Sequence, residues 1–270
     1  MQQKHQLDFS VTVAALAGVL LMPISAFAQW EKVKPLNLPR AADGKPNLSA
    51  PAPRGPDGKP DLSGIWWLST GRSTETAPPK YLENIAADLK PEEVPFQPWA
   101  AALFKERKAN LSKDVPYSRC LPPGLPMITS FAAPWKVIQN PGLIAILYEN
   151  SSTYRQIFMD GRVLSKDANP AWMGYSTGRW DGDTLVVETA GFNDKTWMDF
   201  FGHPHTEALR VTERIRRRDV GHLDVQYTFD DPKAYTKPWS VTIHPILLLE
   251  GDLYEFVCNE NEKDLQHMDK

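Results

Sequence analysis

Short runs in which apolar and polar residues alternate fill the second half of the sequence, and this pattern most narrows what the chain can fold into. In residues 223–229 every second residue is apolar, and Gly-containing turns separate such runs at 181–183 and 250–252. A period of two places apolar side chains on one face of a sheet, and short turns of this kind join antiparallel neighbours. We expect strands at 135–139, 143–149, 153–159, 175–180, 184–190, 209–217, 223–229, 239–248 and 253–258, and an earlier strand at 63–69.

Strands that follow one another in this way leave two outer strands with unpaired backbone groups. A sheet that curls until its edges meet removes those unpaired groups. We therefore predict an all-β fold in which an antiparallel meander closes as a β-barrel, and a two-sheet sandwich is the alternative arrangement.

The first half of the sequence differs in composition and predicts irregular structure. Of the 24 prolines, 17 lie between Pro35 and Pro134. The motif Asp-Gly-Lys-Pro-(Asn/Asp)-Leu-Ser occurs twice, at 43–49 and at 57–63. An Asp-Gly pair followed by Lys-Pro is typical of a turn that leads into an extended segment, so these copies predict a wrapping arm.

Two short helices are expected within the proline-rich region. Pro98 suits the first turn of a helix, and apolar residues follow it at helical spacing to about Leu111. Residues 81–89 predict a shorter helix. We divide the chain after residue 28 into a proline-rich extended arm at 29–62 and a β-barrel domain at 63–270, which includes an irregular and helical insertion at 70–134.

The first residues predict a signal peptide. Lys4 and His5 precede an apolar run at 11–22, Pro23 follows it, and Ala26-Phe27-Ala28 offers the small residues of a cleavage site. We expect cleavage after Ala28 and a periplasmic or secreted protein, with an uncleaved membrane anchor as the alternative. No later segment reaches the roughly 20 apolar residues of a transmembrane helix, so no transmembrane segment is expected after processing.

Composition bears on partners and on compartment. The formal net charge of −3 argues against a nucleic-acid partner, and the basic run at 214–218 is interpreted as a solvated strand face. The chain has two cysteines, Cys120 and Cys258. In an oxidising compartment they predict a disulfide, and two free thiols are the alternative.

Several segments resemble a known group of proteins. Gly64-Ile65-Trp66 resembles the Gly-x-Trp signature on the first strand of lipocalins, and residues 178–185 resemble a hairpin of lipocalin-like bacterial domains. Residues 134–260, with blocks at 178–193 and 231–239, are similar to a widespread group of exported bacterial proteins. The resemblance implies export and a lipocalin-like (calycin-like) β-barrel. The proline-rich arm has no lipocalin counterpart.

The connection at 191–206, with the sequence GFNDKTWMDFFGHPHT, is the first candidate for a functional site. It is longer than a hairpin turn, and long connections in compact domains tend to cover or form binding sites. Its apolar residues include Trp197 and Phe200. Its polar residues include two carboxylates and two imidazoles, namely Asp194, Asp199, His203 and His205.

The two histidines allow three interpretations. Two residues apart in an extended segment, they share a face and could hold zinc or copper, with Asp199 or His244 as a further ligand. Alternatively, one imidazole oriented by Asp194 or Asp199 acts as a general base. In the third interpretation Pro204 fixes a turn and the imidazoles hydrogen-bond to neighbouring carbonyls.

A second group of candidates lies inside the predicted barrel. Strand parity places the carboxylate of Glu213 on an apolar face, where it must be paired or change its pKa. It is either a general acid or base, or it forms a structural ion pair with an inward arginine such as Arg155 or Arg179. Tyr227 shares the apolar face of its strand and is either a ligand contact or a core residue.

We therefore expect an exported lipocalin-like protein that binds a small hydrophobic or aromatic molecule. In its enzymatic form it is a lyase, cyclase or isomerase that needs no cofactor. A carrier without turnover and a metal-dependent enzyme using His203 and His205 are the alternatives. The sequence makes no prediction about the oligomeric state. The expected catalytic residues are His203, His205, Asp199, Asp194 and Glu213, and the expected ligand contacts are Trp66, Trp197, Phe200 and Tyr227.

Overall fold

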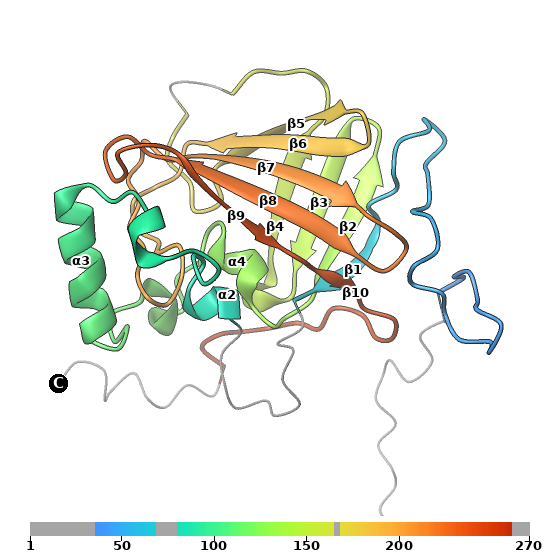
Figure 1. Ribbon diagram of the computed structural model, residues 1–270, viewed down its shortest axis with the longest axis horizontal. Helices are drawn as coiled ribbons and strands as arrows, with labels where there is room; N and C mark the ends of the chain where they lie inside the picture. Colours follow the sequence, from blue (N-terminus) through green and yellow to red (C-terminus); the bar gives the residue numbers. More distant parts are fainter. Residues whose placement is uncertain (1–35, 69–79, 165–167, 261–270) are drawn as a thin grey trace, which may run out of the picture. The chain divides into compact units, whose positions relative to one another are not determined.

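A computed structural model describes residues 36–68, 80–164 and 168–260, and Figure 1 shows its ribbon. The predicted signal peptide and its cleavage site lie outside the described residues. Among the described residues, no helix is long and apolar enough to cross a membrane.

A single ten-stranded sheet forms the framework and curls into a half-barrel, which confirms the predicted all-β, barrel-like class (Figure 1). The strands are β1 (Gly64–Trp67), β2 (Trp135–Asn140), β3 (Leu143–Tyr148), β4 (Thr153–Phe158), β5 (Tyr175–Asp181), β6 (Thr184–Ala190), β7 (Arg210–Arg217), β8 (Leu223–Asp230), β9 (Trp239–Ile243) and β10 (Ile246–Leu247). Most strands follow the predicted alternation of buried and more exposed residues. β6 is an exception, because Leu185, Val186 and Val187 are all buried.

The strand order is β10-β1-β2-β3-β4-β5-β6-β7-β8-β9, so the last two strands in the sequence lie at opposite edges. Only His244 and Pro245 separate them. The chain therefore passes directly from one edge strand to the other. All neighbours are antiparallel except β4 and β5, which pair in parallel through Ile157 with Ser176 and Phe158 with Thr177.

Two predicted strands differ from the structure. The segment 239–248 is split into β9 and β10, because Pro245 has no N–H to donate and interrupts the ladder. The segment 253–258 is not a strand. There the backbone N–H groups of Tyr254 and Phe256 donate to the side chains of Glu149 and Ser152 instead of a neighbouring strand.

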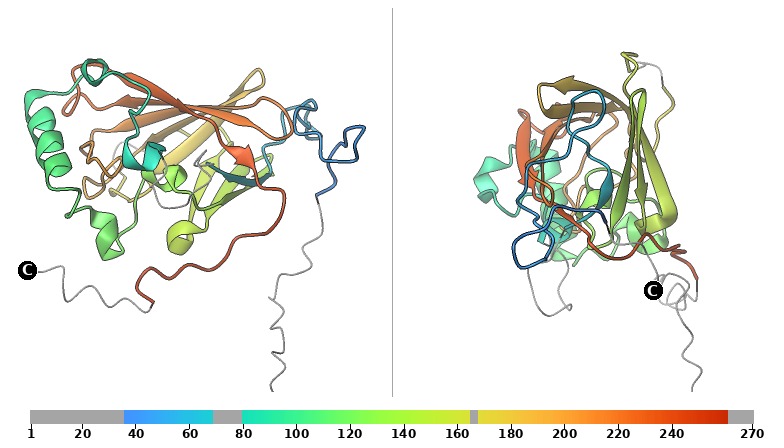
Figure 2. Two further views of the ribbon diagram at one scale, coloured as in Figure 1. Left: turned by 60° about the horizontal axis from the view of Figure 1, so that its bottom comes forward. Right: turned by 90° about the vertical axis from the view of Figure 1, so that its right-hand side faces the viewer.

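The helices are short and gather at one end of the sheet, opposite the arm (Figures 1 and 2). They are α2 (Lys80–Glu83), α3 (Pro98–Ala109) and α4 (Met127–Ser130), with 3₁₀ turns η1 (Pro91–Glu93), η2 (Pro116–Arg119) and η3 (Asn150–Ser152). The helix at Pro98 is confirmed. The helix predicted at 81–89 stops at Glu83, because the next free N–H groups, of Ile85 and Ala86, donate to the side chains of Asp199 and Asn84.

The arm folds as two matching turns rather than as a uniformly extended segment. Each copy of the repeat has one isolated bridge, Arg40 with Pro46 in the first and Arg54 with Pro60 in the second. The second copy is fixed to the β5–β6 turn, because Arg54 donates two hydrogen bonds to Asp183, at 2.9 and 2.6 Å.

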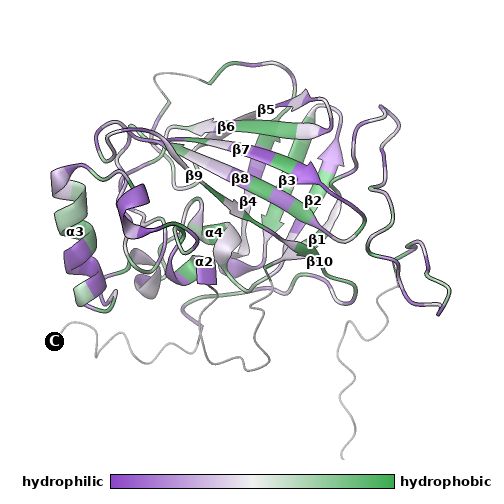
Figure 3. Cartoon of the chain, viewed as in Figure 1, coloured by the Kyte–Doolittle hydropathy of each residue, from purple (hydrophilic) through white to green (hydrophobic). Residues whose placement is uncertain are grey.

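The core lies on the inner face of the curled sheet. Figure 3 shows hydrophobic and hydrophilic residues interspersed along the strands. The predicted parity of β7 and β8 is confirmed, since Glu213 and Tyr227 are both buried on the inner face. A second, smaller cluster lies among the helices and includes Met127 and Phe131.

The predicted disulfide is confirmed. Cys120 and Cys258 are bonded with a Cα–Cα distance of 5.5 Å. The bond joins the residue after η2 to a turn near the end of the described chain, and not to a last strand as the sequence predicted.

Candidate active site at the helical end of the sheet

The connection from β6 to β7 is fixed in place by the helices. The backbone N–H groups of Phe200 and Phe201 donate to the carbonyl oxygens of Leu82 and Glu83 at the end of α2, both at 2.8 Å. Arg107 of α3 donates to the carbonyl of Gly202 at 3.2 Å. Because neighbouring elements hold both sides of this connection, its polar side chains have defined positions.

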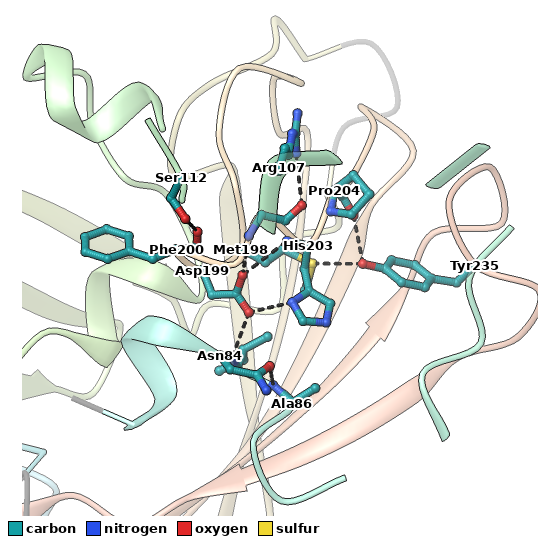
Figure 4. Close-up of polar contacts among 12 residues, drawn as sticks. Asn84, Ala86, Arg107, Ser112, Met198, Asp199, Phe200, His203, Pro204 and Tyr235 are labelled. Atoms are coloured by element: carbon teal, nitrogen blue, oxygen red, sulfur yellow. Dashed lines mark hydrogen bonds and ion pairs between the residues drawn. The ribbon is translucent and has the colours of Figure 1, made fainter. Parts of the chain in front are cut away.

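Asp199 and His203 form a buried dyad within this connection (Figure 4). The imidazole Nδ1 of His203 lies 2.5 Å from Oδ2 of Asp199. The exposed fractions are 0% for Asp199 and 1% for His203. A carboxylate next to Nδ1 favours the tautomer in which Nδ1 carries the proton, which leaves the Nε2 lone pair as the basic site.

Backbone donors hold the carboxylate of Asp199 in place (Figure 4). Its Oδ2 accepts from the N–H of Ile85 at 2.7 Å, and its Oδ1 accepts from those of Gly202 and His203 at 2.9 and 3.1 Å. These three donors fix the positions of both carboxylate oxygens. Asp199 is therefore suited to orient an imidazole and to stabilise it when it takes up a proton.

Aromatic rings surround the imidazole of His203. The ring centroids of Phe104, Phe96 and Trp239 lie 4.3, 5.4 and 5.8 Å from it. The indole Nε1 of Trp239 is buried and has no hydrogen-bond partner within the described part of the chain. The rings of Phe96, Phe104 and Trp239 therefore form an aromatic cover over the dyad. Within this cover, the Nε1–H of Trp239 is available as a hydrogen-bond donor.

The other two polar residues predicted for this site are separate from the dyad. The Nε2 of His205 lies 2.6 Å from the hydroxyl of Thr196, and its Nδ1 lies 3.2 Å from the carbonyl of Thr206. Burial lowers the pKa of His205. Asp194 is exposed. Of the predicted pairs, the structure brings together His203 and Asp199.

The residues proposed as metal ligands do not converge. His244 is exposed and lies 2.8 Å from Asp224 on the outside of the sheet. Across 36–68, 80–164 and 168–260, no group of three or more His, Cys, Asp or Glu side chains is placed to hold a metal ion.

Two of the predicted ligand contacts, both on the 191–206 connection, lie among the helices. Trp197 and Phe200 pack in the smaller cluster, and the guanidinium of Arg107 stacks 4.2 Å from the Trp197 ring. Burial lowers the pKa of Arg107 to about 10. These residues hold the connection against α3.

The inner face of the sheet contains a buried polar centre. The guanidinium of Arg155 on β4 forms an ion pair with Glu213 on β7, and each side chain is 2% exposed. Arg155 also donates to the hydroxyls of Ser176 and Thr189, at 2.9 and 2.7 Å. Burial alone would lower the pKa of Arg155, and the Glu213 carboxylate more than offsets this. One interpretation of Glu213 was a structural ion pair with an inward arginine. The structure contains this ion pair, and the arginine is Arg155.

Next to this centre lie two tyrosines with different surroundings. The hydroxyl of Tyr227 lies 2.7 Å from that of Thr129 on α4. The hydroxyl of Tyr148 and the Nε1 of its cross-strand neighbour Trp135 are buried without a partner among the described residues. Burial raises the pKa of both tyrosines, so both hydroxyls keep their protons at neutral pH.

Trp66 is fully buried at the other end of the sheet. Its Nε1 donates to the carbonyl of Leu62 at 3.0 Å, and the guanidinium of Arg217 lies 4.9 Å from its ring. Its polar atom is therefore satisfied by the chain itself.

Sequence reasoning did not assign Phe96, Phe104 and Trp239 to the site. Phe104 lies within the helix predicted from Pro98 to about Leu111, and the helical pattern alone does not point to the 191–206 connection. Phe96 and Trp239 are far from the 191–206 connection in the sequence, and nothing local in their neighbourhoods points to it. Their convergence depends on where α3 and β9 pack.

The search for similar proteins found no matching family model, curated protein or solved structure. The resemblance to lipocalin-like exported proteins therefore stays a prediction.

Proposed function

We propose that the protein is an enzyme that performs acid–base chemistry on a small apolar or aromatic molecule without a cofactor. The observation that carries this proposal is the His203–Asp199 dyad, held by backbone donors beneath an aromatic cover. Such a dyad supplies a positioned base, and enzymes gain about 10²–10⁴-fold from general acid–base catalysis. The residue roles are His203 as the base and Asp199 as the group that orients it.

The chemistry follows from the atoms available. The Nε2 of His203 removes a proton from a carbon next to a carbonyl group, and the electron pair of the broken C–H bond moves onto the carbonyl oxygen. The N–H of Trp239 donates a hydrogen bond to that oxygen. When the electron pair returns from the oxygen and His203 gives the proton to another carbon, the product is an isomer. In an elimination the returning pair forms a carbon–carbon double bond, and the leaving group departs with its bonding pair and takes up the proton from Nε2.

Access to the base requires movement of the cover. Phe96, Phe104 and the 191–206 connection come from separate parts of the chain, and together they reduce the exposure of His203 to 1%. Displacing the phenylalanine rings opens a path to the imidazole while the Asp199 hydrogen bonds stay intact. A closed apolar cover also keeps water away from the reacting atoms.

Turnover of 5-nitrobenzisoxazole tests the proposal, because this apolar aromatic compound opens when a base removes one carbon-bound proton. We expect His203→Gln to lower kcat/KM by about 10²-fold or more. Trp239→Phe, which keeps an aromatic ring and removes the N–H, should lower it by about 10-fold or more.

The matched control is His244→Gln, since His244 forms a similar His–Asp contact with Asp224 on the exposed face. It should leave kcat/KM unchanged. Equal turnover by the wild type and His203→Gln would contradict the proposal.

A carrier without turnover is the second candidate. The donors of Tyr148 and Trp135 on the inner face have no partner within the described part of the chain. They favour this candidate, because a ligand with a carbonyl oxygen would satisfy them. A carrier should keep a molecule that mass spectrometry detects after native purification, and it should show no turnover for His203→Gln to remove.

We also propose that the protein works outside the cytoplasm. The Cys120–Cys258 bond supports this, because disulfides persist mainly in oxidising compartments. Fractionation of expressing cells tests it, with recovery in the cytoplasmic fraction as the contrary result.

A further inference from the structure

The arm end of the sheet, opposite the dyad, contains a cavity of about 500 Å³. Ile144, Met159 and Trp180 form its apolar floor, where the inner face of the half-barrel ends. The second copy of the repeat forms a wall through Gly55, Pro56, Asp57 and Asp61. Cavities of about 300–1,000 Å³ with apolar linings are typical of small-molecule sites.

The sequence difference between the two repeat copies coincides with this cavity. Over eleven residues, 39–49 and 53–63 are identical except at three positions. There the first copy has Ala41, Ala42 and Asn47, and the second copy has Gly55, Pro56 and Asp61. All three differing residues of the second copy line the cavity.

Both repeat copies form the same turn, so the three residue differences are not needed for folding. In both copies the Asp of the turn accepts the N–H of the Lys two residues later at 3.0 Å, Asp43 from Lys45 and Asp57 from Lys59. The turn glycines have similar positive φ angles, 81° and 75°. An Asn at position 47 therefore supports the same turn as an Asp at position 61.

The charged groups around the cavity are acidic. Asp57 and Asp61 each use one carboxylate oxygen for a backbone N–H, from Lys59 and from Ser63 at 2.9 Å. No lysine or arginine is among the described residues that line the cavity. The site therefore combines negative charge with an indole and a thioether, and this combination favours a cation on an apolar body.

Three cations near the cavity have partners within the described part of the chain. Arg54 is paired with Asp183, and Lys59 donates to the carbonyl of Gly182 at 3.3 Å. Arg217 lies behind the wall, donates to the carbonyl of Asp61 and stacks on the ring of Trp66. Burial lowers the pKa of Arg217, and the carboxylates of Asp61 and Asp219 act against this, so two acidic groups face this one cation. These contacts hold the second copy against the sheet.

We propose that this cavity binds a small organic ammonium ion with an apolar or aromatic body. The ammonium group lies between the carboxylates of Asp57 and Asp61, and the apolar body lies on Trp180 and Met159. The site is separate from the dyad and does not depend on the proposed acid–base activity.

Calorimetric titration of the full chain with three naphthalene compounds tests the proposal: 2-(1-naphthyl)ethylamine, 2-(1-naphthyl)ethanol and 1-naphthylacetate. They share an aromatic body and carry a positive, zero and negative charge. We expect saturable one-to-one binding of the amine, about fivefold or more weaker binding of the alcohol, and the weakest binding of the acetate.

Asp61→Asn copies the residue at position 47 of the first repeat and should weaken amine binding about fivefold. The control is Asp43→Asn, which changes the turn of the first copy and should leave binding unchanged. Thermal unfolding of both variants confirms that the arm stays folded.

Two results would overturn the proposal. The first is binding of the alcohol as tight as that of the amine. The second is an equal effect of Asp43→Asn and Asp61→Asn. His203→Gln should bind the amine as the wild type does, so this result is independent of the outcome at the dyad.

Discussion

Glu213 and Arg155 illustrate what single residues contribute at the centre of the sheet. Strand parity predicts that Glu213 faces inward, and a buried carboxylate requires a partner. The sequence offered two candidates for that partner, Arg155 and Arg179. It could not choose between them, because the choice depends on which strands lie across the half-barrel. Arg179 instead faces outward and pairs with Glu188.

The buried pair predicts a large effect of a single substitution. Glu213→Gln leaves the Arg155 charge buried without its partner, so we expect the free energy of unfolding to fall by about 3–5 kcal/mol. Urea denaturation measures this change. Glu188→Gln, which removes the exposed partner of Arg179, should cost less than about 1 kcal/mol. Equal losses in the two variants would show that the inner pair is not desolvated as described.

Because His205 is buried, we expect the stability of the folded protein to depend on pH. Its pKa in the folded protein is lowered by burial from the ordinary value of 6.5. The unfolded chain therefore binds more protons as the pH falls through 6.5, and stability is lost from there down to the folded pKa. We expect His205→Gln to reduce the loss of stability between about pH 7.5 and about pH 5.5. Unfolding in urea at the two pH values measures it, and an unchanged slope would be the contrary result.

At the scale of elements, the alternating pattern located nearly every strand, because burial of one face fixes the period. The strand prediction was wrong where the ladder of backbone hydrogen bonds between strands is interrupted. Pro245 divides one predicted strand into β9 and β10, and the segment 253–258 bonds to side chains instead of a neighbouring strand. The parallel pairing of β4 and β5 was also not visible in the pattern. A parallel pair needs a connection long enough to bring the chain back to the same end of the sheet. Sixteen residues separate the end of β4 from the start of β5.

The disulfide ties one irregular element to another across 138 residues of sequence. A loop of that length implies a stabilisation of about 4–5 kcal/mol in the chain-entropy description. The Cys120→Ser/Cys258→Ser variant should therefore unfold at a lower urea concentration than the wild type. Reducing agent should shift the wild type to the same midpoint and leave the variant unchanged. A variant as stable as the oxidised wild type would contradict this account.

In the described parts of residues 36–260, the two proposed sites lie at opposite ends of one sheet. The helices, the 191–206 connection and the dyad lie at one end, and the arm covers the other (Figure 2). The candidate loop could be recognised from its length and composition alone. Its aromatic cover could not, because Phe96, Phe104 and Trp239 come together only through packing between distant segments.

We expect the ion pair between Arg54 and Asp183 to protect the second repeat copy from proteolysis. Arg54 fixes the second copy to Asp183, whereas Arg40 donates to the carbonyl of Gly44 within its own turn. We expect Arg54→Met to increase the rate of limited proteolysis within 53–63, and Arg40→Met to leave that rate unchanged. Mass spectrometry of timed digests locates the cuts. Equal rates in the two variants would mean that the ion pair does not hold the arm.

The central claim is that Asp199 holds the Nδ1–H of His203 and leaves Nε2 free to accept a proton from a bound molecule. Two-bond ¹H–¹⁵N correlation spectra of the ¹⁵N-labelled protein test it most directly, with 5-nitrobenzotriazole as an acidic aromatic probe. We predict the Nδ1–H tautomer for His203 in the free protein and protonation of Nε2 when the probe binds. The resonances of His205 should stay in place. An Nε2–H tautomer in the free protein, or a His203 spectrum that saturating probe leaves unchanged, would contradict the account.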